Sequence, residues 1–77
     1  PKPGSWFTYK GERIKIIKAK KINKSGASST ILNKDFMIAC KDGAILPMLI
    51  QREGKKVVSL EDFLRGFTFS IYDKLNA

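Results

Sequence analysis

QREGKKVVSLEDFLRG, residues 51–66, is the most informative stretch of the sequence. Gly54 predicts a turn, because glycine adopts backbone angles that other residues avoid. Ser59 is a favourable helix N-cap, with Asp62 three residues later in an arrangement like a capping box. Gly66 is placed to end the helix in the left-handed conformation. The stretch therefore predicts a strand end, a turn and a short capped helix in succession.

The helix expected at about residues 60–65 has an apolar face formed by Leu60, Phe63 and Leu64. It is under two turns long, and helices this short are not stable alone in water. Its apolar face must therefore pack into something, and the open end of a small barrel is the natural site.

Apolar and polar residues alternate in short runs through the rest of the chain, which is typical of β-strands. The expected strands are residues 5–9, 13–22, 30–32, 36–40 and 44–52. Turns are expected at Lys10-Gly11-Glu12, Asn33-Lys34-Asp35 and Lys41-Asp42-Gly43. The pattern predicts an all-β fold with the one short helix.

The strand at residues 13–22 contains a slip in its alternation. Ile14 and Ile16 occupy one phase, and Ile17 and Ala19 occupy the other. A period of two cannot slip without an extra residue, so we expect a β-bulge near Ile16-Ile17, of the kind that bends strands into small barrels. Pro47 lacks an amide donor, which places it on an edge or at a bulge.

The size of the chain, 77 residues, allows one domain with a thin core. We expect residues 1–4 to be the end of a linker, residues 5–66 to be the domain, and residues 67–77 to be a final strand or a tail. Because the sequence begins at Pro1 without a methionine, we expect a domain taken from a longer protein.

The charge balance favours an anionic partner. Lys and Arg number 15 against 7 Asp and Glu, a formal charge of +8, which attracts nucleic acid first and an anionic membrane second. No apolar run is long enough to span a membrane, and the start lacks a signal-peptide pattern. The single cysteine, Cys40, excludes an internal disulfide and fits a cytoplasmic location. The absence of histidine excludes His-based metal sites, Ser-His-Asp triads and Cys-His pairs.

The candidate nucleic-acid-binding residues are basic. The polar face of the strand and loop at residues 13–24 carries Arg13, Lys15, Lys18, Lys20, Lys21 and Lys24, and the later turn adds Lys55 and Lys56. Lysines that neutralise phosphates position a nucleic acid but do not read its sequence. A solvated charged face is the simpler alternative. For Lys55 and Lys56, a purely structural role in the turn stays equally open.

The remaining notable side chains favour structural roles. Trp6, Phe7 and Tyr9 could stack on unpaired bases, but a small barrel needs large side chains inside, so we expect them in the core. Cys40 should be a small buried hydrophobe. Glu61 and Asp62 are better explained as helix-start residues than as a general acid and base. Gln51 should satisfy backbone groups in the turn. We therefore expect neither catalytic nor metal-binding residues.

In sequence order, the landmarks resemble the C-terminal domain of methionyl-tRNA formyltransferases. They are Pro3-Gly4-Ser5-Trp6-Phe7, Gly11, Ile14-Lys15-Ile16, Lys18-Ala19, Thr30-Ile31-Leu32, Ile38-Ala39-Cys40, Asp42-Gly43, Ile50-Gln51, Gly54-Lys55-Lys56 and Asp62-Phe63-Leu64-Arg65-Gly66. The resemblance covers residues 1–66 and is most specific at residues 51–66. It departs at Ser28-Ser29, where the family usually has Pro-Gly.

The resemblance implies an open Greek-key barrel similar to an OB-fold, following a catalytic domain that this chain lacks. The catalytic domain would transfer a formyl group from 10-formyltetrahydrofolate to methionyl-initiator tRNA. This domain would orient the tRNA through phosphate contacts, with no catalysis and no cofactor of its own. The alternative is an interdomain or protein-interaction module of another formyltransferase-type enzyme, with incidental basic charge.

Overall fold

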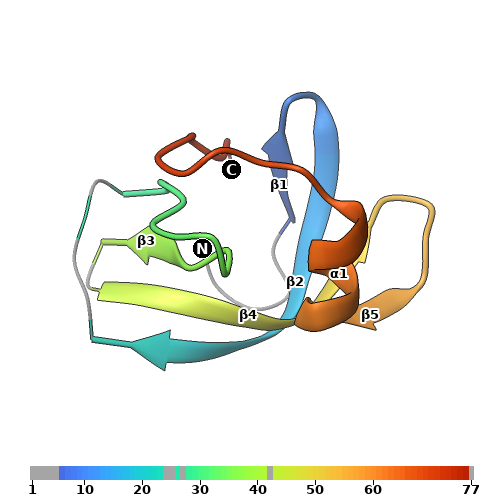
Figure 1. Ribbon diagram of the computed structural model, residues 1–77, viewed down its shortest axis with the longest axis horizontal. Helices are drawn as coiled ribbons and strands as arrows, with labels where there is room; N and C mark the ends of the chain where they lie inside the picture. The colour runs from blue at the N-terminus through green and yellow to red at the C-terminus, as the bar shows by residue number, and fades with distance from the viewer. Residues whose placement is uncertain (1–5, 24–25, 27, 42, 77) are drawn as a thin grey trace.

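A computed structural model describes residues 6–23, 26, 28–41 and 43–76 (Figure 1). In chain order the elements are β1 (Trp6–Tyr9), β2 (Glu12–Ile22), β3 (Ile38–Cys40), β4 (Gly43–Arg52), β5 (Val57–Ser59) and α1 (Leu60–Gly66). All strand pairs are antiparallel, in the order β1-β2-β4-β3, with β5 also paired to β4. The sheet curls into an open half-barrel, which confirms the predicted all-β, OB-like fold.

The β1–β2 hairpin and the bulge in β2 follow the sequence pattern. Lys10 and Gly11 both have positive φ, 49° and 82°, as a tight two-residue hairpin turn requires. Ile16 pairs with Ile50, and the register then shifts on both sides of Lys18 before it returns to its earlier value. The predicted irregularity after Ile16 is therefore confirmed.

Pro47 lies where β4 has a partner on only one side. It pairs with Ala19 of β2, but the other edge of β4 pairs with β3 only as far as Ile45 and with β5 only from Leu49. A residue in this gap has no ladder hydrogen bond to donate, so proline is tolerated. This confirms the expected place of Pro47 at an irregular part of the strand, where one edge has no partner.

Two predicted strands are shorter than the sequence suggested. The strand expected at 36–40 begins only at Ile38, because Phe36 has φ 69° and cannot be extended. Asn33 organises the preceding turn: its side-chain oxygen accepts from the amides of Asp35 (3.0 Å) and Met37 (3.2 Å). The strand expected at 30–32 is reduced to isolated bridges.

The core is centred on Phe36, which is fully buried. Its ring lies 5.1 to 6.3 Å, centroid to centroid, from the rings of Phe7, Phe63, Phe67 and Phe69. Aromatic pairs in these tilted and edge-to-face arrangements add about 0.5–1.5 kcal/mol beyond area burial. Phe63 comes from α1, so the short helix does plug the end of the half-barrel, as its apolar face predicted.

The two ends of α1 differ in how well they match the prediction. Ser59 is the N-cap, and its hydroxyl accepts from the Asp62 amide at 3.2 Å. Gly66, however, is the last helical residue and lacks the positive φ expected of a left-handed cap. The chain continues in extended conformation at Phe67 (φ −125°), because this direction carries the Phe67 ring into the core.

The segment at residues 67–76 forms neither a regular strand nor a loose tail. It crosses the opening of the half-barrel from α1 back to β1 (Figure 1). Isolated bridges join Asn76 to Thr8 and Lys74 to Thr30. The Tyr9 hydroxyl donates to Asp73 at 2.5 Å. The segment therefore covers the mouth of the barrel.

Candidate nucleic-acid interface

Four of the predicted basic residues share the outer face of β2. Ile14 and Ile16 are fully buried, so Arg13 and Lys15 point outward. The irregularity after Ile16 keeps the later lysines on this side, because Ala19 packs against the core. We call this surface the basic strand face; it consists of Arg13, Lys15, Lys18 and Lys20.

Of the remaining two residues predicted for this face, the structure describes only Lys21, and Lys21 does not join it. Lys21 follows Lys20 in a regular stretch, so its side chain points to the opposite side of the sheet, across from Ile45. Lys24 lies outside the described residues. The expectation that Lys21 shares the face of Lys20 was wrong, because consecutive residues of a regular strand point to opposite sides of the sheet.

Trp6 lies on the basic strand face instead of in the core. Phe7 and Tyr9 are each 4% exposed and belong to the core, as predicted. Trp6 alternates with them and is only partly buried; its ring faces the Arg13 guanidinium at 4.6 Å and the Lys15 ammonium at 5.6 Å. Contacts of this kind contribute about 0.5–1 kcal/mol at exposed sites. The outer face thus combines an aromatic ring with cations.

Arg13 connects the basic strand face to the turn between β4 and β5. Its guanidinium lies 3.4 Å from Glu53, with both side chains more than half exposed. Such exposed pairs contribute about 1 kcal/mol or less and are screened by salt. Lys18 and Lys20 form no ion pair with any residue that the structure describes. Most of the charge of this face is therefore available to an anionic partner.

The β4–β5 turn holds the second group of predicted basic residues. Gly54 has φ 79°, and the Lys55 amide donates to the Arg52 carbonyl at 2.9 Å. Gln51 donates from its side-chain amide to the Lys55 carbonyl at 2.9 Å, the backbone role expected for it. Lys55 and Lys56 are exposed.

A cleft lies between this turn and α1. Its volume is about 320 Å³, and its lining residues are Arg52, Lys55, Lys56, Val58, Asp62, Phe63 and Gly66.

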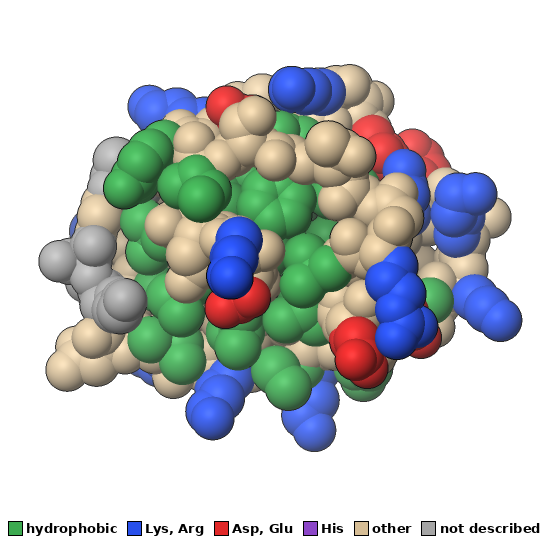
Figure 2. Space-filling view, in the orientation of Figure 1, with side chains coloured by type: hydrophobic (Ala, Val, Ile, Leu, Met, Phe, Trp, Pro, Cys, Tyr) green, Lys and Arg blue, Asp and Glu red, His purple; other side chains and the backbone are tan. Residues whose placement is uncertain are grey.

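In Figure 2, hydrophobic side chains gather over the middle of the visible face, and Lys and Arg project mainly from its edges. That face is therefore not a continuous basic surface.

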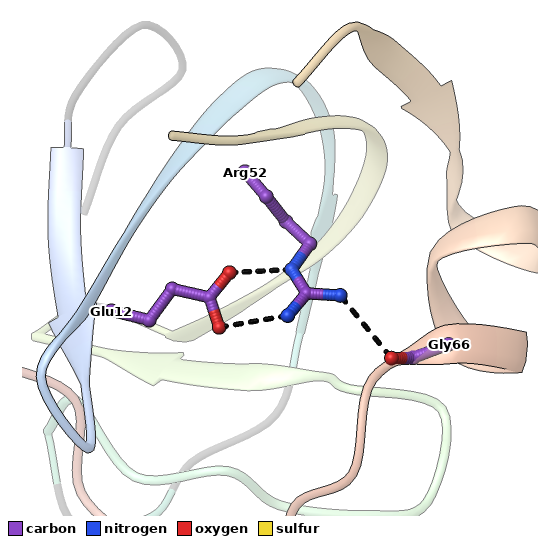
Figure 3. A network of polar contacts seen from close by, with 3 residues as sticks. All are labelled: Glu12, Arg52 and Gly66. Carbon is purple, nitrogen blue, oxygen red and sulfur yellow. Dashed lines mark hydrogen bonds and ion pairs between the residues drawn. The ribbon is translucent and has the colours of Figure 1, made fainter. Parts of the chain in front are cut away.

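Arg52 is fixed at the edge of the cleft by two other elements (Figure 3). Its guanidinium donates to both carboxylate oxygens of Glu12, at 2.5 and 2.9 Å, and to the Gly66 carbonyl at 3.2 Å. The same group lies 5.2 Å from the Phe67 ring. The hydrogen bonds from Arg52 lower the pKa of the Glu12 carboxyl. Partial burial opposes this shift, and the positive charges of Arg52 and Lys55 add to it.

Within the described ranges, no three His, Cys, Asp or Glu side chains are grouped closely enough to hold a metal ion. No helix in the described part of the chain is long and apolar enough to cross a membrane. Cys40 packs against the core, close to its expected role.

Sequence reasoning missed two features of the site. The alternation in Trp6-Phe7-Thr8-Tyr9 already places Trp6 opposite Phe7 and Tyr9, so its outer position could have been found. The pairing of Glu12 with Arg52 had no sequence signal, because 40 residues separate the two partners.

The fold and the surface define a small, basic domain built on an open half-barrel of antiparallel strands. A profile of the family described as "Formyl transferase, C-terminal domain" matches residues 1–68. The chain belongs to this family.

Proteins named methionyl-tRNA formyltransferase are similar in sequence. The one from Rhizorhabdus wittichii is 42% identical over 69 residues, which are 87% of this chain and 22% of that protein. The one from Rickettsia bellii is 39% identical over 77 residues, 97% of this chain and 25% of that protein. The one from Acidiphilium cryptum is 40% identical over 75 residues, again 97% and 25%. The chain thus spans about a quarter of the length of these relatives.

Proposed function

We propose that this chain is the tRNA-binding C-terminal domain of a methionyl-tRNA formyltransferase. The basic strand face would hold phosphates of the initiator methionyl-tRNA and so orient it, and Lys55 and Lys56 would extend that surface. The observation that carries the proposal is the basic strand face itself: four cations on one side of one strand, beside a partly exposed tryptophan. The enzyme name shared by the relatives supports tRNA as the anionic partner.

The reaction itself would belong to the rest of a longer, cytoplasmic polypeptide. The chain has no histidine, the side chain that most often serves as the general base of a nucleophile. The formyl donor 10-formyltetrahydrofolate would be a substrate of the missing catalytic part, with no site in this domain.

Binding of initiator tRNA to the 77-residue chain at increasing salt tests the proposal. Each phosphate contact adds about 0.7–0.9 to the slope of log K against log salt. Replacing Lys18 and Lys20 by alanine should therefore lower the slope by about 1.5 and weaken binding.

The matched control replaces Lys34 and Lys41, two exposed lysines in turns away from the basic strand face. This variant has the same net charge as the test variant. Equal losses in both variants would mean that only net charge matters, and binding that is absent or insensitive to salt would reject the proposal.

A second candidate function, contact with another protein domain, has its own supporting observation. The side chains of Met48 and Leu49 on β4 and of Val57 on β5 are 40%, 36% and 43% exposed. Apolar side chains at a surface favour protein contact. If this function is the main one, replacing Leu49 and Val57 by serine should abolish formylation by the full-length enzyme, while replacement of Lys18 and Lys20 should leave it unchanged.

A further inference from the structure

We propose that the cleft between the β4–β5 turn and α1 binds one unpaired nucleotide of an RNA. The base would lie against the apolar lining and the phosphate against Lys55 and Lys56. This inference rests on the proposed function and adds to it a specific contact, because the basic strand face supplies only non-specific phosphate contacts.

The size of the cleft suits a single nucleotide. Its volume of about 320 Å³ lies at the lower end of the range of about 300–1,000 Å³ usual for small-molecule sites. A helical stem cannot enter such a space, whereas a base that is not stacked in a helix can. RNA-binding proteins obtain sequence preference mainly from such unstacked bases.

The lining has the two chemical characters of a nucleotide. Val58 and Phe63 supply apolar lining, and Lys55 and Lys56, which also line the cleft, each carry an aliphatic stem below the ammonium group. The Phe63 ring stacks on Phe67 at a centroid distance of 4.5 Å, so this wall is part of the core and rigid. A flat base would find an apolar wall here, with cations at the rim for its phosphate.

The charge of the rim favours an anionic group such as a phosphate over a basic or apolar peptide. Three cations, Arg52, Lys55 and Lys56, stand against the one carboxylate of Asp62. Arg52 is already held by Glu12 and Gly66, so it contributes a fixed wall. Lys56 lines the cleft and forms no ion pair within the described ranges.

Asp62 gives the cleft a preference among bases. One of its carboxylate oxygens accepts from Arg65 at 2.9 Å, which leaves further lone pairs on the carboxylate. A carboxylate accepts hydrogen bonds and does not donate, so it pairs with a base that bears an amino group, such as cytosine N4. Uracil presents oxygen at that position and should be disfavoured.

The experiment follows the backbone amide signals of the isotope-labelled 77-residue chain during titration with short oligocytidylate or oligouridylate. The signals of Val58, Asp62 and Gly66 should shift with oligocytidylate, and binding of oligouridylate should be about tenfold weaker. Asp62→Asn should remove this difference, because an amide can pair with either base. An unchanged preference in this variant would overturn the role of Asp62.

Matched variants at β5 test the location. Val58→Trp fills the cleft and should abolish the shifts, whereas Val57→Trp, on the outer face, should retain them. Because Val58 also packs against the core, the surface variant Lys55→Ala/Lys56→Ala provides a second test. It should weaken oligocytidylate binding about tenfold.

Three outcomes separate this inference from the proposed function. If tRNA binds but the cleft variants bind tRNA and oligocytidylate as tightly as the wild type, only the cleft inference fails. If an acidic peptide shifts the cleft signals and oligocytidylate does not, the cleft is a protein-docking site and the inference is overturned. If the wild type binds no tRNA at all, the proposed function itself fails.

Discussion

Replacing Arg52 by alanine should destabilise the chain by about 2 kcal/mol. The guanidinium makes two hydrogen bonds to Glu12, a third to the Gly66 carbonyl and a contact with the Phe67 ring. The Arg52 and Glu12 side chains are 28% and 33% exposed. Exposed pairs contribute about 0.2–1 kcal/mol, and breaking buried pairs costs about 3–5 kcal/mol, so a half-buried, bidentate pair lies between. In a domain of this size, the melting temperature should fall by about 10 °C.

The loss should depend on pH in a definite direction. Arg52 lowers the folded-state pKa of Glu12 below its ordinary value of 4.5, so the unfolded chain binds this proton more readily. The stabilisation is therefore complete above pH 4.5 and disappears as the pH falls through the lower, folded-state value. The difference between wild type and Arg52→Ala should be constant from about pH 7 to about pH 5 and shrink below that.

The assay is urea unfolding followed by the fluorescence of Trp6, the single tryptophan. A double-mutant cycle combines Arg52→Ala with Glu12→Ala and should give a coupling free energy of about 1–1.5 kcal/mol at neutral pH. Arg52→Lys keeps the charge but loses the planar fork, so it should recover less than half of the loss. A coupling below about 0.3 kcal/mol, or one that is the same at acid and neutral pH, would refute the reasoning.

Three other substitutions test the turn, the helix start and the covering segment. Ser59→Ala removes the acceptor of the Asp62 amide and should cost about 1 kcal/mol in urea unfolding, whereas Ser59→Asp should cost little. Gly54→Ala places a side chain at φ 79° and should cost about 1 kcal/mol; an unchanged midpoint would contradict the strain. Tyr9→Phe removes the hydroxyl that donates to Asp73 and should accelerate amide hydrogen exchange at residues 70–76. Equal exchange rates in wild type and variant would mean that this hydrogen bond does not hold the segment over the barrel.

The sequence predicted the local elements well where the residue types themselves impose the geometry. Glycine at Gly11 and Gly54 marks the turns, and Ser59 marks the helix start, because each depends on backbone angles or a hydrogen bond within a few residues. The slip of alternation after Ile16 predicted the bulge for the same reason.

The failures share a different cause, which is contact with distant residues. Gly66 does not form the left-handed cap because the core draws Phe67 inward in an extended conformation. Phe36 has positive φ, and in this conformation its ring lies at the centre of the aromatic core. β3 therefore begins two residues later than expected. The extended conformation after Gly66 has no local signal, whereas the turn that precedes Ile38 is also held locally by Asn33.

The candidate site divides in the same way. Charge and alternation, together with the slip after Ile16, placed Arg13, Lys15, Lys18 and Lys20 on one face of a strand, because this pattern is local to the strand. The tertiary structure adds three contacts that alternation does not give: the pairing that brings Trp6 against Arg13, the ion pair of Arg52 with Glu12 across 40 residues, and the cleft beside Lys55. The alternation of side chains along one strand can be read from the sequence. The surface that several strands form together depends on how the strands pair, and that pairing is set by the whole barrel.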